Sequence, residues 1–173
     1  MYKSEGLLKD STLIEIKALY DSLPEEQIKR YYNLFYLTQR TIPRDKFITE
    51  FESEGLKIHN QYFLDYIEGS FTKAHSDNND LVKKTSITLV EVNDLVGGDI
   101  IVYEPHYKSD MEVPEDGSVI NRYNERDAAE GRAIIPVIVK QEVGETIAYG
   151  PDVMHSVSKV LKGNRIVLVT WYE

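Results

Sequence analysis

Residues 151–173 read PDVMHSVSKVLKGNRIVLVTWYE, the most informative stretch of the chain. It contains a histidine, His155, then a Gly-Asn pair at 163–164, and then Arg165 at the start of an apolar run. Gly-Asn between two runs rich in β-branched residues is typical of a turn between neighbouring strands. The stretch therefore predicts one strand that carries a histidine and a following strand that opens with an arginine.

Arg165 opens a strand whose side chains would alternate between two faces. Its own face is otherwise apolar and carries Val167, Val169 and Trp171. A guanidinium on such a face is costly to bury unless an anion meets it. The pattern predicts that Arg165 binds either an acidic residue of the chain or a ligand carboxylate, which a guanidinium can hold with two parallel hydrogen bonds.

A histidine and an aspartate stand two positions apart in AHSDN, residues 74–78. In a strand, His75 and Asp77 would project onto the same face. With His155 they would supply two imidazoles and one carboxylate, the open three-ligand arrangement of non-haem Fe(II) oxygenases. A His-x-Asp pair also occurs by chance at ordinary surface or core positions. The hypothesis of a metal site therefore depends on the combination with His155 and Arg165.

From about residue 58 the apolar residues recur with a period of roughly two. The runs are short, rich in Val, Ile, Thr and Tyr, and separated by Gly, Asn and Pro. The strands predicted on this basis are 58–66, 73–77, 85–92, 99–103, 136–141, 146–149, 155–160 and 165–172. No helical run separates them, which favours a jelly roll or barrel over a parallel α/β sheet.

Residues 1–57 are expected to form a helical support. A capping box and apolar residues at helical spacing predict a first helix at 12–23. A proline suited to the first helical turn predicts a second helix at 24–37, and a short third helix is predicted at 45–55. The expected fold class is mainly β with N-terminal helices: a double-stranded β-helix (jelly roll, cupin-like) supported by about three helices.

The whole chain, 1–173, is expected to be a single domain with its jelly-roll core at 58–173. One segment, at about 104–135, is long, charged and rich in turn residues. A loop of that length in a compact domain is usually functional or disordered. We expect a lid or a substrate-binding loop there.

Composition narrows the class of protein. Hydrophobic residues make up 42% of the chain, and no apolar run reaches the ~20 residues of a membrane span. The first residues, MYKSEGLLKD, lack the apolar core of a signal peptide, and no cysteine is available for disulfides or thiolate metal sites, so a cytoplasmic location is expected. The formal net charge of -9 argues against nucleic acid as a partner.

Three motifs together resemble those of the Fe(II)- and 2-oxoglutarate-dependent dioxygenases, most closely the prolyl 4-hydroxylase-like branch. They are AHSDN at 74–78, VGGDIIVYEP at 96–105 and HSVSKVLKGNRIVLVTW at 155–171. The family pattern is His-x-Asp, a Gly-Gly before a strand, a distal histidine, and a basic residue about ten positions later. The resemblance spans roughly residues 60–173.

The resemblance implies that His75, Asp77 and His155 are the iron ligands. It also implies that Arg165 holds the distal carboxylate of 2-oxoglutarate. Many prolyl 4-hydroxylases have lysine at this position and other relatives have arginine. Tyr66 matches the region where relatives place a tyrosine near the cosubstrate, so it is a further candidate for cosubstrate binding.

Some relatives carry another cosubstrate-contacting tyrosine on the strand after His-x-Asp, where this chain has Glu91. Tyr149 and Thr88 are the candidates to supply that contact. His59 and His106 match no ligand position of the family, so structural or surface roles are expected for them.

The cofactors implied by the resemblance are Fe(II), 2-oxoglutarate and O2, with ascorbate as a further candidate. The implied activity is hydroxylation of an unactivated C–H bond, with release of succinate and CO2. The implied substrate is a prolyl or other amino-acid residue, so the partner is a small molecule, a peptide or a protein. Asp77 favours hydroxylation over halogenation, because the related halogenases lack this carboxylate.

Two other interpretations stay open on the sequence. The first is an oxygenase of small metabolites on the same scaffold. The second is a cupin-like barrel that binds a metal or a sugar without oxygenase activity, which would make the spacing of His155 and Arg165 a coincidence. A barrel without oxygenase activity should not respond to 2-oxoglutarate, with or without metal.

Overall fold

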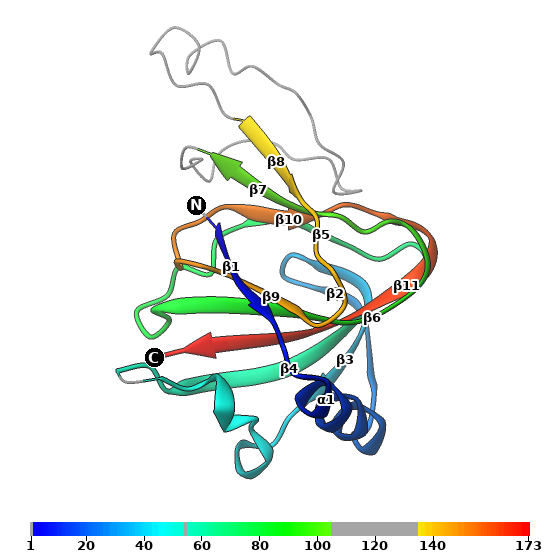
Figure 1. Cartoon of the computed structure of the whole chain (residues 1–173). Helices are drawn as coiled ribbons and strands as arrows, with labels where there is room; N and C mark the ends of the chain where they lie inside the picture. The colour runs from blue at the N-terminus through cyan, green and yellow to red at the C-terminus, as the bar shows by residue number, and fades with distance from the viewer. Residues whose placement is uncertain (1, 54, 105–134) are drawn as a thin grey trace, which may run out of the picture.

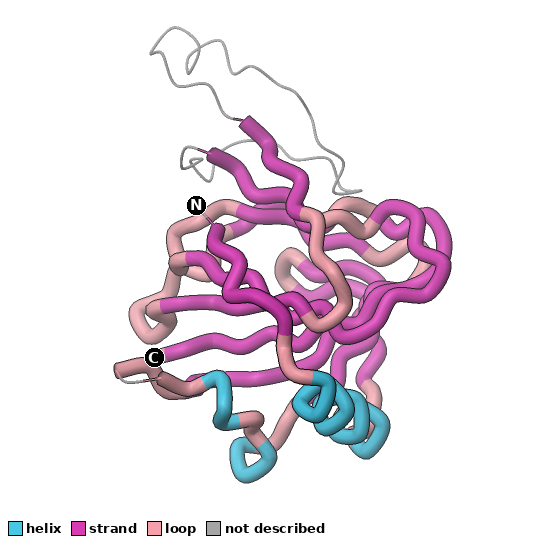
Figure 2. Tube along the Cα trace, in the orientation of Figure 1, coloured by secondary structure: helices cyan, strands magenta, loops and turns pink. Residues whose placement is uncertain are grey.

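The computed structural model describes residues 2–53, 55–104 and 135–173. These residues form a mainly β structure with one α-helix and two short 3-10 turns (Figure 1, Figure 2). The elements are β1 (Tyr2–Leu7), α1 (Asp10–Ser22), β2 (Glu26–Tyr31), β3 (Leu34–Thr41), η1 (Arg44–Lys46), η2 (Thr49–Phe51), β4 (Ile58–Tyr66), β5 (Phe71–His75), β6 (Lys84–Gly97), β7 (Ile100–Glu104), β8 (Ile135–Val139), β9 (Glu145–Tyr149), β10 (His155–Val157) and β11 (Val160–Tyr172). No helix in these three ranges is long and apolar enough to span a membrane.

The described strands pair antiparallel in one 11-stranded sheet that curls around an interior (Figure 1). The strand order is β1-β9-β6-β11-β4-β3-β5-β10-β7-β8, and β2 pairs with β3 beside this path. β11 pairs with β4 along one edge and with β6 along the other, so it lies at the centre of one wall. The jelly-roll prediction is confirmed, and every strand predicted after residue 58 overlaps an observed strand. The turn predicted at Gly163-Asn164 is wrong, because β11 begins at Val160 and runs through both residues with irregular pairing to β6, so Arg165 lies within the strand and does not open it.

The two faces of β11 belong to two different cores, because side chains alternate along a strand. Val167 and Val169 join a large apolar cluster inside the barrel, which also contains Leu64. Ile166 and Leu168 join a second cluster with residues of α1. The helix therefore packs on the outer face of the sheet (Figure 1), and the interior of the barrel holds the candidate site.

The helix predicted at 24–37 is wrong, because these residues form the β2–β3 hairpin. The aromatic residues suggested a buried helical face, yet Tyr31, Tyr32 and Tyr36 are 57%, 80% and 57% exposed. β3 pairs with β4 and with β5, so its backbone hydrogen bonds are made across the sheet. Strand pairing of β3, whose residues have high β propensity, thus overrides the helical spacing of the apolar residues in this segment.

The helix predicted at 45–55 is also wrong, and two 3-10 turns, η1 and η2, take its place. The N–H of Ile48, between the turns, donates to Oε1 of Gln61 on β4 at 2.8 Å. That N–H would bond within the chain in a continuous α-helix, so a tertiary hydrogen bond interrupts the helical pattern. The first predicted helix is confirmed as α1, although the capping box predicted at Thr12 is wrong: the helix begins at Asp10, its N-cap is Lys9 without a side-chain cap, and Thr12 is buried within it.

The loop predicted at 104–135 lies outside the described residues, apart from its two ends. There Glu104 of β7 and Ile135 of β8 are partners in the sheet. The prediction of a lid or substrate-binding loop therefore stays a prediction.

Candidate metal centre

β5, near the middle of the chain, and β10, near its C-terminus, bring the two candidate histidine ligands together. His75 is the last residue of β5 and His155 the first of β10, and the two are partners in the antiparallel register. Asp77 follows two residues after His75, just beyond the end of β5 and not within the strand as predicted. One ligand atom from each of the three residues lies within 4.8 Å of the others. The structure therefore places the predicted triad in one cluster.

The potential ligand atoms of the cluster face one another. Nε2 of His75 lies 3.6 Å from Oδ1 of Asp77, and Nε2 of His155 lies 3.9 Å from Oδ2 of the same carboxylate. The two imidazole rings are tilted by 54°, with their centroids 4.4 Å apart. Both Nε2 atoms and the carboxylate thus surround a common point.

Backbone carbonyls fix the tautomer of both imidazoles. Nδ1 of His75 lies 2.7 Å from the carbonyl oxygen of Lys73, and Nδ1 of His155 lies 3.0 Å from that of Val153. A carbonyl oxygen only accepts, so each Nδ1 donates, and the Nε2 lone pair remains for a metal. Burial, reinforced by the nearby His155, lowers the pKa of His75 to about 4, so that His75 is neutral at neutral pH.

The Asp77 carboxylate is oriented by a threonine of β6. Oγ1 of Thr85 donates to Oδ2 of Asp77 at 2.7 Å, and the Asp77 side chain is only 6% exposed. A buried carboxylate is costly unless a cation or sufficient hydrogen bonds compensate it. Two imidazoles and one carboxylate form a donor set that suits a divalent first-row metal such as Fe(II). The chemistry of these side chains therefore fits the predicted metal.

A tyrosine contacts one of the candidate ligand atoms directly. The hydroxyl of Tyr149, at the end of β9, lies 3.0 Å from Nε2 of His155. Burial, reinforced by the Asp77 carboxylate, raises the pKa of Tyr149 well above its usual value. Tyr149 was predicted as a cosubstrate contact, and the structure places its hydroxyl against His155, a candidate metal ligand.

A cavity of about 40 Å³ adjoins the three candidate ligands. Its walls are mainly apolar, with hydroxyl and indole groups among them. The lining residues are Leu34, Tyr62, Leu64, Tyr66, Thr72, His75, Asp77, Ile87, Ile100, Tyr149, His155, Val157, Val169 and Trp171. A mainly apolar wall with a few polar groups beside a metal site is typical of a small-molecule pocket.

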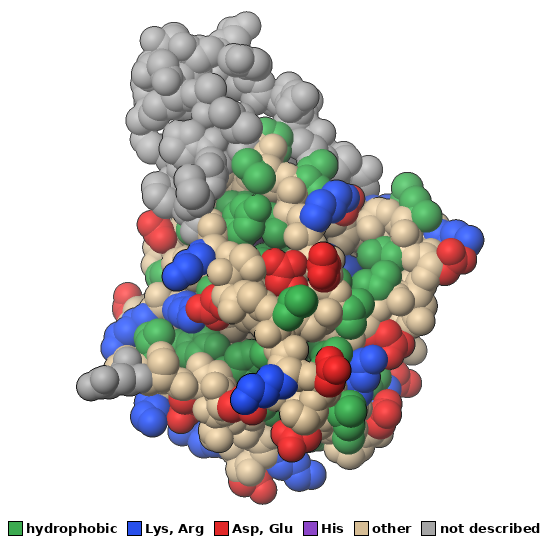
Figure 3. Space-filling view, viewed as in Figure 1, with side chains coloured by type: hydrophobic (Ala, Val, Ile, Leu, Met, Phe, Trp, Pro, Cys, Tyr) green, Lys and Arg blue, Asp and Glu red, His purple; other side chains and the backbone are tan. Residues whose placement is uncertain are grey.

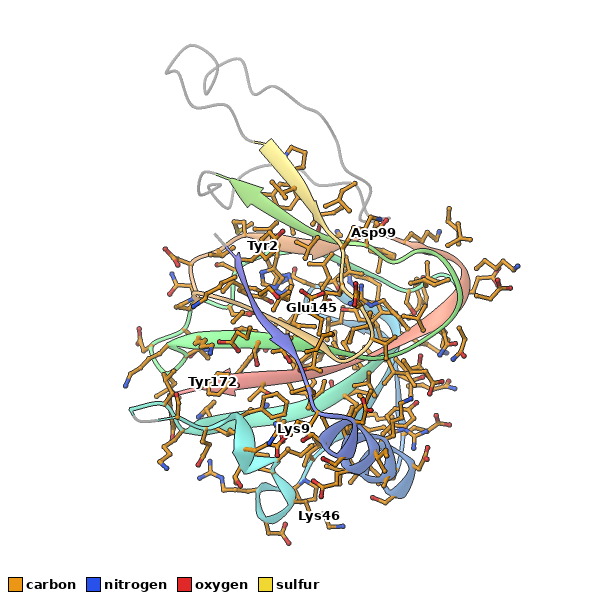
Figure 4. The ribbon with its side chains drawn as sticks, viewed as in Figure 1. Tyr2, Lys9, Lys46, Asp99, Glu145 and Tyr172 are labelled. Carbon is orange, nitrogen blue, oxygen red and sulfur yellow. The ribbon has the colours of Figure 1, made fainter. Side chains whose placement is uncertain are left out.

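Arg165 is buried inside the barrel, as the strand pattern predicts, and is 5% exposed. One terminal nitrogen donates to the carbonyl oxygen of Gly98, and the other lies 3.5 Å from Oε1 of Gln141. Among the described residues, no carboxylate lies within salt-bridge distance of Arg165, and its Nε is buried without a hydrogen-bond partner. Asp99, labelled in Figure 4, attracts the guanidinium from a greater distance while its carboxylate binds Lys140.

The internal salt bridge considered from the sequence is thus not formed within the described residues. Burial lowers the pKa of Arg165, although electrostatic interactions with Tyr66 and Asp99 oppose that change. A buried guanidinium without a close carboxylate remains a site for an anion. Its Nε also lacks an acceptor.

Tyr66 separates Arg165 from the cavity. The guanidinium carbon lies 5.7 Å from the centroid of the Tyr66 ring, and Tyr66 is a cavity wall while Arg165 is not. The Tyr66 hydroxyl is 2.9 Å from Oγ1 of Thr72, and both side chains are buried. The structure therefore places Tyr66 in the cavity wall, with Arg165 against its ring.

Thr88, the other proposed source of a cosubstrate contact, faces away from the site. It pairs with Leu168, a member of the outer cluster, and its hydroxyl lies 2.7 Å from that of Thr146. His59 bonds Glu173 at 2.9 Å on the surface, which agrees with its expected structural role. His106 lies outside the described residues.

The sequence did not identify three of the side chains at the site: Thr85, Tyr62 and Trp171. Trp171 could have been found, because it shares a strand face with Arg165 and that face is inside the barrel. Thr85 carried no comparable signal, because its role depends on how the chain after β5 returns towards β6. Tyr62 and Trp171 meet edge to face with centroids 6.0 Å apart, and both line the cavity.

No protein-family model and no curated protein matches the chain. Solved structures do match, among them a 2OG-Fe(II) oxygenase-family oxidoreductase from Burkholderia pseudomallei, with TM-score 0.65 and 16% identity over 96% of this chain and 80% of that chain. A Pseudomonas putida prolyl-4-hydroxylase has TM-score 0.62 and 12% identity over 99% of this chain and 91% of its own. A non-heme alpha-ketoglutarate-dependent carbocyclase from nogalamycin biosynthesis has TM-score 0.68 and 11% identity, over 99% and 78% respectively. The chain shares the fold of 2-oxoglutarate- and Fe(II)-dependent oxygenases, including a prolyl hydroxylase.

Proposed function

We propose that this chain is an Fe(II)- and 2-oxoglutarate-dependent dioxygenase that hydroxylates an unactivated C–H bond. The observation that carries the proposal is the cluster of His75, Asp77 and His155, whose potential ligand atoms lie within 4.8 Å of one another. The cluster lies inside a jelly roll that is similar to those of 2-oxoglutarate- and Fe(II)-dependent oxygenases. Fold alone does not assign an activity. The cluster adds the donor set that the chemistry needs.

In this proposal the three side chains hold Fe(II) on one side and leave the cavity side open. His75 and His155 contribute Nε2, since each Nδ1 is engaged by a backbone carbonyl. Asp77 contributes its carboxylate, oriented by Thr85. With 2-oxoglutarate and O2, the bound iron supplies oxidising power that hydroxylates the substrate and releases succinate and CO2.

Arg165 is proposed to bind the distal carboxylate of 2-oxoglutarate. It is a buried cation with no carboxylate within salt-bridge distance among the described residues, and its Nε has no acceptor. A carboxylate held by a guanidinium gains charge-assisted hydrogen bonds and offsets the cost of the buried charge. Because Tyr66 lies between Arg165 and the cavity, we propose that its ring shifts when the cosubstrate enters and that its hydroxyl serves as a second contact.

For the substrate we propose a prolyl or other amino-acid residue, free or within a peptide. The resemblance of the motifs to the prolyl 4-hydroxylase-like branch and the shared fold support this choice. Nucleic acid is a poor candidate for the substrate, because the net charge of the chain is -9 and the phosphate backbone is also negative. The face in Figure 3 shows acidic side chains interspersed among the basic ones, and not a continuous basic surface. A small-metabolite oxygenase on the same scaffold is the second candidate, because the carbocyclase of nogalamycin biosynthesis shares the fold.

The first test is a thermal melt without oxygen, with Mn(II), with 2-oxoglutarate, and with both. A ligand that binds only the folded state at ~100 times its dissociation constant adds about 2.7 kcal/mol of stability. For a domain of this size that amounts to several degrees. We expect the two ligands together to stabilise far more than either alone, because 2-oxoglutarate needs the metal as a partner.

The matched controls are Asp77→Ala and Asp80→Ala. Asp77→Ala should lose the stabilisation and any succinate release, while Asp80→Ala, an exposed carboxylate of the same segment, should keep both. Stabilisation by metal without any added effect of excess 2-oxoglutarate would instead support the cupin-like barrel. Full activity of Asp77→Ala would remove this residue from the site.

A further inference from the structure

Tyr149 and His155 form a contact that the proposed metal chemistry does not use. The Tyr149 hydroxyl lies 3.0 Å from Nε2 of His155, and the two rings lie 4.5 Å apart, tilted by 44°. Tyr149 is 4% exposed and His155 5% exposed, so water does not compete freely for this bond. The Nε2 atom involved is the one that points towards Asp77.

The direction of the hydrogen bond follows from the other nitrogen of the ring. Nδ1 of His155 lies 3.0 Å from the carbonyl oxygen of Val153 and must donate to it. A neutral imidazole has only one N–H, so Nε2 accepts and the Tyr149 hydroxyl donates. The bond therefore occupies the lone pair through which His155 would bind a metal.

We infer that the Tyr149 hydroxyl is an intramolecular competitor of the metal at His155. It caps Nε2 in the metal-free protein and must leave this atom when a metal binds. The inference rests on the proposed metal site and goes beyond it, because it assigns Tyr149 a role against the metal and not towards the cosubstrate. Metal affinity is then set partly by a hydrogen bond that binding has to break.

The register of the sheet limits how Tyr149 can move away. Tyr149 is the last residue of β9, where it is paired with Thr85 of β6 and with Tyr2 of β1. Its backbone is thus held between two strands, so we expect the hydroxyl to leave Nε2 by rotation of the side chain and not by movement of the strand.

The test is a titration of metal-free wild type and Tyr149→Phe with Mn(II), without oxygen or 2-oxoglutarate. The free ion is followed by electron paramagnetic resonance. A buried neutral hydrogen bond contributes about 0.5–1.5 kcal/mol net, and about 1.4 kcal/mol is tenfold in affinity. Tyr149→Phe should therefore bind Mn(II) roughly two- to tenfold more tightly than wild type.

The matched control is Tyr172→Phe, which removes a buried hydroxyl that lies 3.1 Å from Ser86 and does not line the cavity. Its Mn(II) affinity should equal that of wild type. Unchanged or weaker binding by Tyr149→Phe, with wild type binding Mn(II), would overturn the inference and leave the proposed function standing. Failure of both proteins to bind Mn(II) would overturn both.

A second measurement does not depend on metal binding. Nitrogen-15 NMR of the histidine side chains in the metal-free protein should show His155 protonated on Nδ1. Its Nε2 signal should move towards that of an unbonded imidazole nitrogen in Tyr149→Phe. An Nε2 signal that is identical in the two proteins would show that the hydroxyl does not cap this atom.

Discussion

The inner face of the central strand β11 borders the candidate metal site, whereas its outer face packs against the helix. On the inner face, Arg165 and Trp171 flank two valines beside a cavity with titratable groups. On the outer face, Ile166 and Leu168 pack in a wholly apolar cluster with α1. The difference of one residue along the strand separates the two environments. Chemistry and stability can therefore be altered independently on opposite sides of one sheet wall.

The largest effect should come from the outer face. Phe63 of β4 is fully buried there and meets Tyr20 of α1 edge to face, with centroids 5.3 Å apart. Phe63→Ala removes this ring and leaves a cavity, which should lower the free energy of unfolding by about 3–5 kcal/mol. Urea unfolding followed by circular dichroism measures this loss.

The same variant tests whether the faces are independent. The Mn(II) affinity of folded Phe63→Ala should equal that of wild type, because none of the three candidate metal ligands belongs to the outer cluster that contains Phe63. Phe63→Leu, which keeps most of the volume, should lose less than about 1.5 kcal/mol. A tenfold weaker metal affinity in folded Phe63→Ala would show that the two cores are coupled.

The next effect concerns Arg165 on the inner face. A hydrogen bond to a charged group contributes about 1.5–3 kcal/mol, so Arg165→Ala should weaken 2-oxoglutarate binding to the Mn(II)-loaded protein roughly ten- to hundredfold. Isothermal titration calorimetry measures this change. Mn(II) affinity should stay the same, because Arg165 is not among the metal ligands.

Arg165→Lys is the matched control, since it keeps the charge but loses the forked geometry of the guanidinium. It should fall between wild type and Arg165→Ala. If Arg165→Ala binds 2-oxoglutarate as tightly as wild type does, the cosubstrate assignment of this residue fails. The anion for the buried guanidinium would then have to be sought elsewhere.

The contrast between the two faces also explains what the sequence could predict. A period of two is a local property, so the strands after residue 58 and the shared face of Arg165 and Trp171 were predictable. The triad was predicted from the His-x-Asp pair, His155 and Arg165 taken together, and the ligand roles of the three residues were implied by the resemblance of these motifs to the oxygenase family. Only the position of Asp77, just past β5, differs from the expectation.

The β2–β3 hairpin was not predictable from its own residues. The spacing of its aromatic residues matched a helix. The residues form strands because β3 pairs with β4 and β5, which lie later in the chain. The hydrogen bonds of Thr85 and Tyr149 were hidden for a similar reason. The turns at 78–84 and 150–154 determine which hydroxyl meets which ligand, and no periodicity describes a turn.

The smallest expected effect comes from comparing two threonines that lie on opposite faces of a single strand, β6. Thr85 faces inward and donates to Asp77 at 2.7 Å, while Thr88 faces outward and bonds Thr146 at 2.7 Å. Each can be replaced by valine, which keeps the shape and removes one hydroxyl. Loss of a hydrogen bond to a metal ligand typically costs 10–100-fold in metal affinity, and we expect the lower end for Thr85→Val, about tenfold.

Thr88→Val should leave Mn(II) affinity unchanged, although it loses a hydrogen bond of the same length on the same strand. Both variants should lose a similar free energy of unfolding, about 0.5–1.5 kcal/mol. The pair thus separates loss of stability from loss of ligand orientation, which a single variant cannot do. If Thr85→Val and Thr88→Val bind Mn(II) equally well, the Thr85 hydroxyl does not orient Asp77. The backbone around Asp77 would then fix its position, and the Thr85 hydroxyl would contribute only stability, as the Thr88 hydroxyl does.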